Sequence, residues 1–243
     1  MKKRILCGAM TLMAGSLLAA DSDDVMAAAK KLDGQSNYSW KTTVAVPEGG
    51  GGGRFRPGPT EGKTEKDGYT WLSMTLGDNT TVAVIKGDKG AAKMEGEWRS
   101  LAELADDGGQ PGPGSFLARM LRNYKTPAAQ AGDIAGKTKE LKKDGDAYSG
   151  DLTEEGAQDL LRFGGRRGGG GGQAPPPAKD AKGSVKFWVK DGQVAKIEYK
   201  VSGTVSFGGQ DRDIDRTTTI EIKDVGSTKI EVPEEAKKKM SGT

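Results

Sequence analysis

The chain has 243 residues, of which 34% are hydrophobic and 29% charged, and it contains one cysteine and no histidine. The absence of histidine excludes Ser-His-Asp and Cys-His catalysis, and it excludes zinc sites that depend on imidazole. There are 37 basic and 34 acidic residues, but three of the basic ones lie in residues 1–20, so the rest of the chain carries 34 of each. Such a balanced chain lacks the excess of cations that drives binding to phosphate backbones, and we expect no nucleic-acid partner.

The N-terminus has the pattern of a bacterial secretory signal peptide. Lys2, Lys3 and Arg4 precede an apolar run that ends in small residues at Ala20 and is followed at once by acidic residues. The run is short for a membrane-spanning helix. Cys7 precedes most of it, whereas a lipid-bearing cysteine would follow it, so we expect no lipid anchor. We predict a signal peptide at residues 1–20 cleaved near Ala20, a single domain at 21–243, and a periplasmic or otherwise secreted location.

The first part of this domain predicts one helix followed by strands. Residues 21–32 fit a helix because acidic residues begin it, lysines end it, and Val25, Ala28 and Leu32 fall on one face. Residues 37–46 alternate, with Trp40 on the apolar side, as in a half-buried strand. The same reasoning predicts strands at residues 37–46, 64–76, 81–86 and 91–98.

The middle of the chain is more helical. Ser100 and Glu103 have the spacing of a capping box. Residues 115–124 predict a short helix because large apolar side chains recur every four residues. Residues 153–163 predict another, capped by Thr153. Short strands are expected around residues 137–142 and at 147–152.

The C-terminal part predicts a meander of long strands. Residues 184–189 alternate, Asp191-Gly192 is a strong hairpin signal, and residues 195–207 alternate again over about 13 positions. So long a strand with one apolar face suits a strongly curved sheet or half-barrel. We expect the remaining elements to be a strand at 217–223, a short edge strand at 229–232 closed by Pro233, and a helical tail at 234–240.

Two runs of five glycines, Gly49–Gly53 and Gly168–Gly172, predict Gly-rich loops at about residues 47–62 and 164–182. Neither run has the pattern of a phosphate-binding loop. They are either plain loop expansions or a basic rim around a binding mouth. In the second case their arginines would meet anionic head groups, and the candidates are Arg54, Arg56, Arg166 and Arg167.

Other motifs give no sign of catalysis. The segment Asp211–Asp215 lacks the glycine and the distal glutamate of an EF-hand loop, so we interpret it as a solvated hairpin end. No GxSxG nucleophile motif is found in the sequence, and no pair of carboxylates stands out. We therefore expect no catalytic residue, no metal site and no cofactor, and a hydrolase is the least favoured function.

Three stretches carry a resemblance to a known family. They are DDVMAAAKKLDGQSNYSWKTTVAV at 23–46, KFWVKDGQVAKIEYKVSGTV at 186–205 and TIEIKDVGSTKIEVPEEA at 219–236. In this order they resemble the LolA/LolB-like periplasmic lipoprotein-carrier superfamily, which includes the LppX/LprG-like lipid carriers. The resemblance implies an α+β, mostly β fold, an open and strongly curved antiparallel half-barrel with short helices covering its concave face. It also implies a cavity that holds acyl chains.

Two functions follow from this resemblance. The first is a non-enzymatic carrier or sensor that binds acyl chains of lipids or lipoproteins, with peripheral contact to a membrane. The second is a structural or protein-binding module of the cell envelope, with the same fold, a packed interior and an envelope protein as its partner. Candidate cavity residues for the carrier are Trp40, Leu72, Met74, Phe116, Met120, Ile197 and Tyr199.

Overall fold

The computed structural model describes residues 15–47, 57–66, 68–77, 79–106, 112–162, 176–207 and 210–242. The strands are β1 (Asn37–Ala45), β2 (Pro57–Glu65), β3 (Thr70–Leu76), β4 (Asn79–Lys86), β5 (Lys89–Met94), β6 (Glu97–Ser100), β7 (Lys142–Asp144), β8 (Ala147–Asp151), β9 (Lys179–Lys190), β10 (Gln193–Phe207) and β11 (Gln210–Lys223). The helices are α1 (Gly15–Asp33), α2 (Leu101–Ala105), α3 (Pro113–Arg122), α4 (Pro127–Ala135), α5 (Glu154–Leu161) and α6 (Glu234–Ser241).

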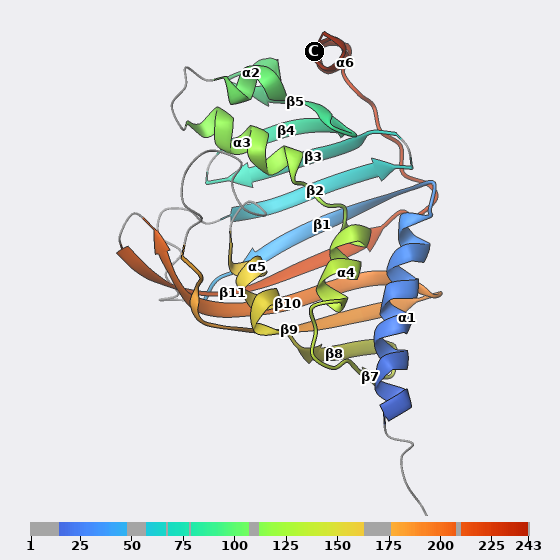
Figure 1. Ribbon diagram of the computed structural model, residues 1–243. Coiled ribbons are helices and arrows are strands. Elements are labelled where there is room, and N and C mark those ends of the chain that lie inside the picture. The colour runs from blue at the N-terminus through green and yellow to red at the C-terminus, as the bar shows by residue number, and fades with distance from the viewer. Residues whose placement is uncertain are drawn as a thin grey trace, which may run out of the picture.

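All these strands form one antiparallel sheet in the order β6-β5-β4-β3-β2-β1-β11-β10-β9-β8-β7. Two meanders are joined where the first strand pairs with the last, with Trp40 opposite Ile222 and Val44 opposite Thr218. The sheet is open, with β6 and β7 at its two edges, and it curves around the helices (Figure 1). This confirms the predicted fold class of an open antiparallel half-barrel with short helices.

The two faces of the sheet are covered differently. Helices α1 to α5 supply buried side chains to one large apolar cluster on the concave face (Figure 1). Helix α6 lies on the other face, where Ala236 and Met240 pack with Val84 and Trp98 in a second, smaller cluster. Adjacent residues of β5 divide between them, since Ala92 belongs to the large cluster and Ala91 to the small one. The sheet therefore separates two apolar clusters, one on each of its faces.

Two predicted strands are hairpins in the structure. The segment 64–76 turns between Glu65 and Tyr69, where backbone hydrogen bonds close the turn between β2 and β3. The segment 91–98 turns at Glu95 and Gly96, whose φ angles of 52° and 89° suit a tight hairpin. Both turns contain a glycine in the sequence, Gly68 and Gly96, and each predicted strand ran through that turn signal.

The predicted Gly-rich loops are shorter than expected, and one predicted strand is absent. Residues 57–62 belong to β2 and residues 179–182 belong to β9. The segment 229–232 forms no strand. Strand β1 is already paired on both sides by β2 and β11, and the backbone N–H of Ile230 instead donates to the side chain of Glu65 at 3.2 Å.

Several local predictions are confirmed. Ser100 and Glu103 form both hydrogen bonds of a capping box at α2, and Thr153 caps α5 through the N–H of Gly156 at 3.0 Å. Asp191 and Gly192, with φ of 53° and 71°, turn the β9–β10 hairpin. Residues 211–215 lie near the end of the β10–β11 hairpin, where Asp213 accepts a hydrogen bond from Thr204 at 2.6 Å.

Other local predictions are wrong. A strand expected around 137–142 is reduced to β7 at 142–144 and an isolated bridge between Thr138 and Leu152. A register shift between Val194 and Lys196 puts Val194 into the core, so the predicted alternation does not extend to Ala195. The helix α4 is not predicted at all, and it proves central to the site.

Candidate functional site

The concave face of the sheet brings most of the candidate cavity residues together. Trp40, Leu72, Met74 and Ile197 are 3%, 0%, 5% and 0% exposed, and all four belong to the large apolar cluster under the helices. They come from β1, β3 and β10, and alternation along each strand points them to the same face. Helices α3, α4 and α5 cover them with buried leucine, isoleucine and alanine side chains.

The other candidates lie differently. Met120 of α3 and Tyr199 of β10 are half-buried and pack against the same cluster. Phe116, one turn before Met120, is half-buried outside that cluster, with the Arg119 guanidinium 5.9 Å from its ring centroid. The four rim arginines, Arg54, Arg56, Arg166 and Arg167, lie outside the described residues.

An aromatic group that the sequence did not single out surrounds Trp40. Tyr38, two residues earlier on the same face, has its ring centroid 5.6 Å from that of Trp40. Tyr124 stacks on Trp40 at 6.4 Å with an interplanar angle of 20°. Tyr124 belongs to the short segment between α3 and α4, so this linker reaches down onto the sheet. Tyr38 follows the same alternation as Trp40, but no sequence spacing relates Tyr124 to either of them.

Gly62 of β2 explains how the Trp40 ring can lie so close to the sheet. A Cβ at this position would lie 2.1 Å from Cζ2 of Trp40 and 2.7 Å from its Nε1. Gly62 pairs with Trp40 across the two strands, so the indole lies over the glycine backbone. The close approach requires glycine here. Trp40 thereby contacts both the backbone of Gly62 and the ring of Tyr124.

Two polar groups of this aromatic cluster are buried without a hydrogen bond. Within the described part of the chain, the Tyr38 hydroxyl and the Trp40 indole N–H make none of ordinary geometry. Thr126 and the Ala128 backbone lie near the Tyr38 hydroxyl, and Tyr124 lies near the Trp40 indole, without reaching such geometry. Buried polar groups normally have partners, so these two groups could bind a further polar group.

Burial also acts on the ionisable groups of this face. It raises the pKa of the phenols of Tyr38, Tyr124 and Tyr199, because the charged phenolate is poorly solvated there. It lowers the pKa of the Arg216 guanidinium, which lies on β11 and is 9% exposed. Arg216 donates through Nη2 to the carbonyl oxygen of Leu160 in α5. This hydrogen bond joins the helical cover to the sheet.

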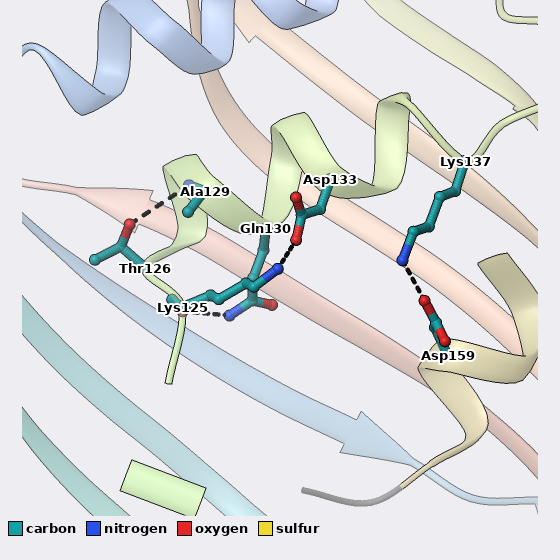
Figure 2. Close-up of polar contacts among 7 residues, drawn as sticks. All are labelled: Lys125, Thr126, Ala129, Gln130, Asp133, Lys137 and Asp159. Atoms are coloured by element: carbon teal, nitrogen blue, oxygen red, sulfur yellow. Dashed lines mark hydrogen bonds and ion pairs between the residues drawn. The ribbon is translucent and has the colours of Figure 1, made fainter. Parts of the chain in front are cut away.

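Helices α4 and α5 are held by a small set of polar contacts (Figure 2). Thr126 caps α4, and the Gln130 side chain donates to the Lys125 carbonyl at 2.7 Å. Lys125 forms an ion pair with Asp133 inside the same helical unit. The ion pair between Lys137 and Asp159 is different, because it joins the end of α4 to α5 (Figure 2).

Half-buried apolar side chains occur on both layers where helices α3 to α5 meet the concave face of the sheet, a contact that we call the helix–sheet seam. Leu160 of α5, Tyr124 and Met120 contribute from the helical side, and Tyr199 and Ile214 from the sheet. All five pack against the buried cluster. Because they belong to separate elements, moving one short helix would enlarge the exposed apolar surface without breaking the hydrogen bonds of the sheet.

Four surface hollows formed by described residues lie away from the candidate cavity residues. Four open hollows with mixed polar lining occur around Lys139, Glu140, Trp71 and Asp24, and none of the seven cavity candidates lines them. Among the described residues there is no group of three or more acidic or cysteine side chains that could hold a metal ion. Nor does any helix in these ranges combine the length and apolarity needed to cross a bilayer.

Comparison with known proteins finds similar solved structures. No family model and no curated protein matches the sequence. Among solved structures, the chain is similar to LprF from Mycobacterium bovis, with a TM-score of 0.46, 11% identity, and 90% of this chain and 98% of that one covered. It is similar to the lipoprotein LppX of Mycobacterium tuberculosis, with a TM-score of 0.46, 8% identity, and 88% and 99% covered.

A LolA superfamily protein from Nitrosomonas europaea matches with a TM-score of 0.33 and 11% identity, over 88% of this chain and 95% of that one. The fold of the present chain is established by its own strand order and helix placement.

Proposed function

We propose that the protein is an exported, non-enzymatic carrier that binds the acyl chains of a lipid or lipoprotein between the concave face of its sheet and helices α3 to α5. In this proposal residues 1–20 are removed near Ala20, residues 21–243 act as one domain, and the protein touches the membrane only peripherally. The ligand-contacting side chains are Trp40, Leu72, Met74, Met120, Ile197 and Tyr199, and Phe116 lies beside the entrance. Arg54, Arg56, Arg166 and Arg167 would meet the head group.

One observation carries the proposal: apart from α1, the continuous apolar face is covered by several short helices instead of a second sheet. Each of α2 to α5 has ten residues or fewer. A helix of this length is not stable by itself and depends on its packing. The cover can therefore rearrange piece by piece while the antiparallel sheet keeps its own hydrogen bonds. An acyl chain that enters the helix–sheet seam would separate apolar side chains of the helices from those of the sheet. It would offer both layers an equally apolar surface in return.

The packed interior favours a second candidate, a structural or protein-binding module of the envelope. Its supporting observation is that the concave cluster is continuous, with Leu72 and Ile197 fully buried. A carrier with this structure must open to load, whereas a structural module never needs to. The two candidates therefore differ in whether the interior accepts a lipid.

The first experiment is native mass spectrometry of the protein purified from the periplasm of an expressing bacterium, followed by organic extraction of the same sample. We expect one or more bound species with acyl chains. A clean protein mass that also persists after incubation with phospholipid or lipopeptide vesicles would contradict the carrier and leave the structural module.

A substitution locates the binding face. Met74→Trp adds bulk to the concave cluster, and we expect it to reduce lipid uptake severalfold while the protein stays folded, at a stability cost of about 1–3 kcal/mol. Met240→Trp is the matched control, because Met240 is 6% exposed against 5% for Met74 but packs on the opposite face. Uptake measured from vesicles, with circular dichroism as the folding check, should fall only for Met74→Trp. Equal uptake by both variants would contradict this placement of the ligand.

A further inference from the structure

We propose that the Tyr38 hydroxyl and the Trp40 indole N–H bind a neutral carbonyl oxygen of the ligand, so that the carrier selects lipids whose chains are attached through ester or amide groups. This inference rests on the proposed function and names the chemistry that the same face would recognise. Tyr38 and Trp40 are 2% and 3% exposed, so both polar groups lie deep in the interior.

The position of the two groups suits a shared acceptor. They stand two residues apart on β1, point to the same face, and have ring centroids 5.6 Å apart. The indole N–H can only donate, and the phenol can donate as well. In the structure neither makes a hydrogen bond of ordinary geometry with a described residue, and Thr126, the Ala128 backbone and Tyr124 are the polar groups that lie near them. A ligand that completes this site must therefore bring a hydrogen-bond acceptor.

The surroundings favour a neutral acceptor over a charged one. Burying a carboxylate or phosphate without a cation is costly, and the side chains around Trp40 are aromatic or apolar. After the larger effect of burial, the Asp33 carboxylate at the end of α1 also raises the pKa of Tyr38. A negative group beside Tyr38 would be repelled by the same carboxylate. An ester or amide carbonyl has the needed oxygen without the charge.

Access to the site passes Tyr124. Its ring stacks on the Trp40 indole, which also lies against the backbone of Gly62. Because Tyr124 sits in the linker between α3 and α4, it can leave Trp40 without disturbing a strand. An entering lipid replaces the Tyr124 ring over the indole and places its carbonyl at the two donors.

The test is a direct competition between two lipids. Vesicles contain equal amounts of a diester phosphatidylglycerol and its diether analogue with the same chains, which lacks only the carbonyl groups. The protein is incubated with the vesicles and re-isolated, and the ratio of the two bound lipids is measured by mass spectrometry. We expect the wild-type protein to hold about five to ten times more diester lipid, the effect of one neutral hydrogen bond.

Variants assign the selectivity to the two side chains. Tyr38→Phe removes one oxygen with little change of shape and should lower the ratio, and Tyr38→Phe combined with Trp40→Phe should bring it close to one. Trp188→Phe is the control, because Trp188 lies on the opposite face between Lys186 and Lys196, and it should keep the wild-type ratio.

The outcomes separate the two proposals. Equal binding of both lipids by the wild-type protein overturns the carbonyl site and leaves the carrier standing. Binding of neither lipid overturns the carrier itself, and the carbonyl site with it. The wild-type measurement decides between these outcomes even if the double variant fails to fold. A double variant that folds and keeps the wild-type ratio of bound lipids would show that residues other than Tyr38 and Trp40 determine the selectivity, and it would overturn the carbonyl site.

Discussion

At the scale of single residues, the contact between Trp40 and Gly62 organises the concave face. The indole ring occupies the space that any side chain at position 62 would need. Alternation along β1 predicted that Trp40 points inward, and the structure confirms it. The partner residues could not be predicted, because Gly62 belongs to a segment expected to be a loop, and Tyr124 comes from a distant linker. Such contacts depend on the register of strands and on helix packing, which short-range patterns do not encode.

The residue-scale prediction concerns glycine. Gly62→Ala should destabilise the protein by about 1–3 kcal/mol, because its Cβ would overlap the Trp40 ring. Gly132→Ala is the control: position 132 lies in α4 with no heavy atom within 4 Å of an added Cβ, so we expect stabilisation by about 0.5–1 kcal/mol. Urea denaturation of both variants gives the free energies of unfolding. A neutral Gly62→Ala would mean that the indole is free to move.

At the scale of elements, the sequence predicted those with strong local signals and missed those without. The capping box of α2, the Thr153 cap of α5 and the Asp191-Gly192 turn are found where expected. Helix α4 was missed because PAAQAGDIA is built mainly of small residues and has only a weak apolar period. Its start did carry a signal, since Thr126 caps it and Pro127 occupies its first turn.

The element-scale prediction concerns the junction of α4 and α5. The side chains of Lys137 and Asp159 are 29% and 27% exposed, so their ion pair is partly shielded from solvent. Lys137→Gln should cost about 0.5–1 kcal/mol, increase amide hydrogen exchange in α4 and α5, and speed lipid uptake.

The control for this junction is Lys125→Gln. It removes the charge of an ion pair that stays within the α4 unit, and both partners are more exposed, at 52% and 46%. We expect it to leave hydrogen exchange in α5 and the uptake rate unchanged. If Lys137→Gln behaves in the same way, α4 and α5 do not separate when lipid enters.

At the scale of the whole molecule, the C-terminal segment holds the outer face together. From the end of β11 it passes the ends of the neighbouring strands, with the Gly226 N–H donating to the Asn37 carbonyl at 2.9 Å (Figure 1). It ends in α6, where Lys239 pairs with Glu103 at 2.6 Å. The sequence predicted this helix, at residues 234–240, but as a tail without a packing partner. Its burial against Trp98 could not be foreseen, because the predicted sheet left the outer face without a cover.

The whole-molecule prediction is a truncation after Pro233. It removes Ala236 and Met240 from the outer cluster and should lower the free energy of unfolding by about 2–4 kcal/mol. The total emission of the four tryptophans should shift to longer wavelength as the Trp98 indole meets water. Lipid uptake, referred to the folded fraction, should stay within about twofold because the concave face is untouched. Loss of uptake by folded, truncated protein would show that the two faces are coupled.

The pairing of β1 with β11 has a consequence for the order in which the chain can fold. Within the described strands the two meanders are joined by this pair, which links residues separated by most of the sequence, such as Ser39 and Lys223. Contacts of such long range form slowly, because a large loop must close first. The pairing of β1 with β11 in the middle of the sheet cannot form until β11, the last strand, has been synthesised. In the export route proposed above the chain would cross a membrane unfolded, and a slow closure of the β1–β11 pair would favour that crossing.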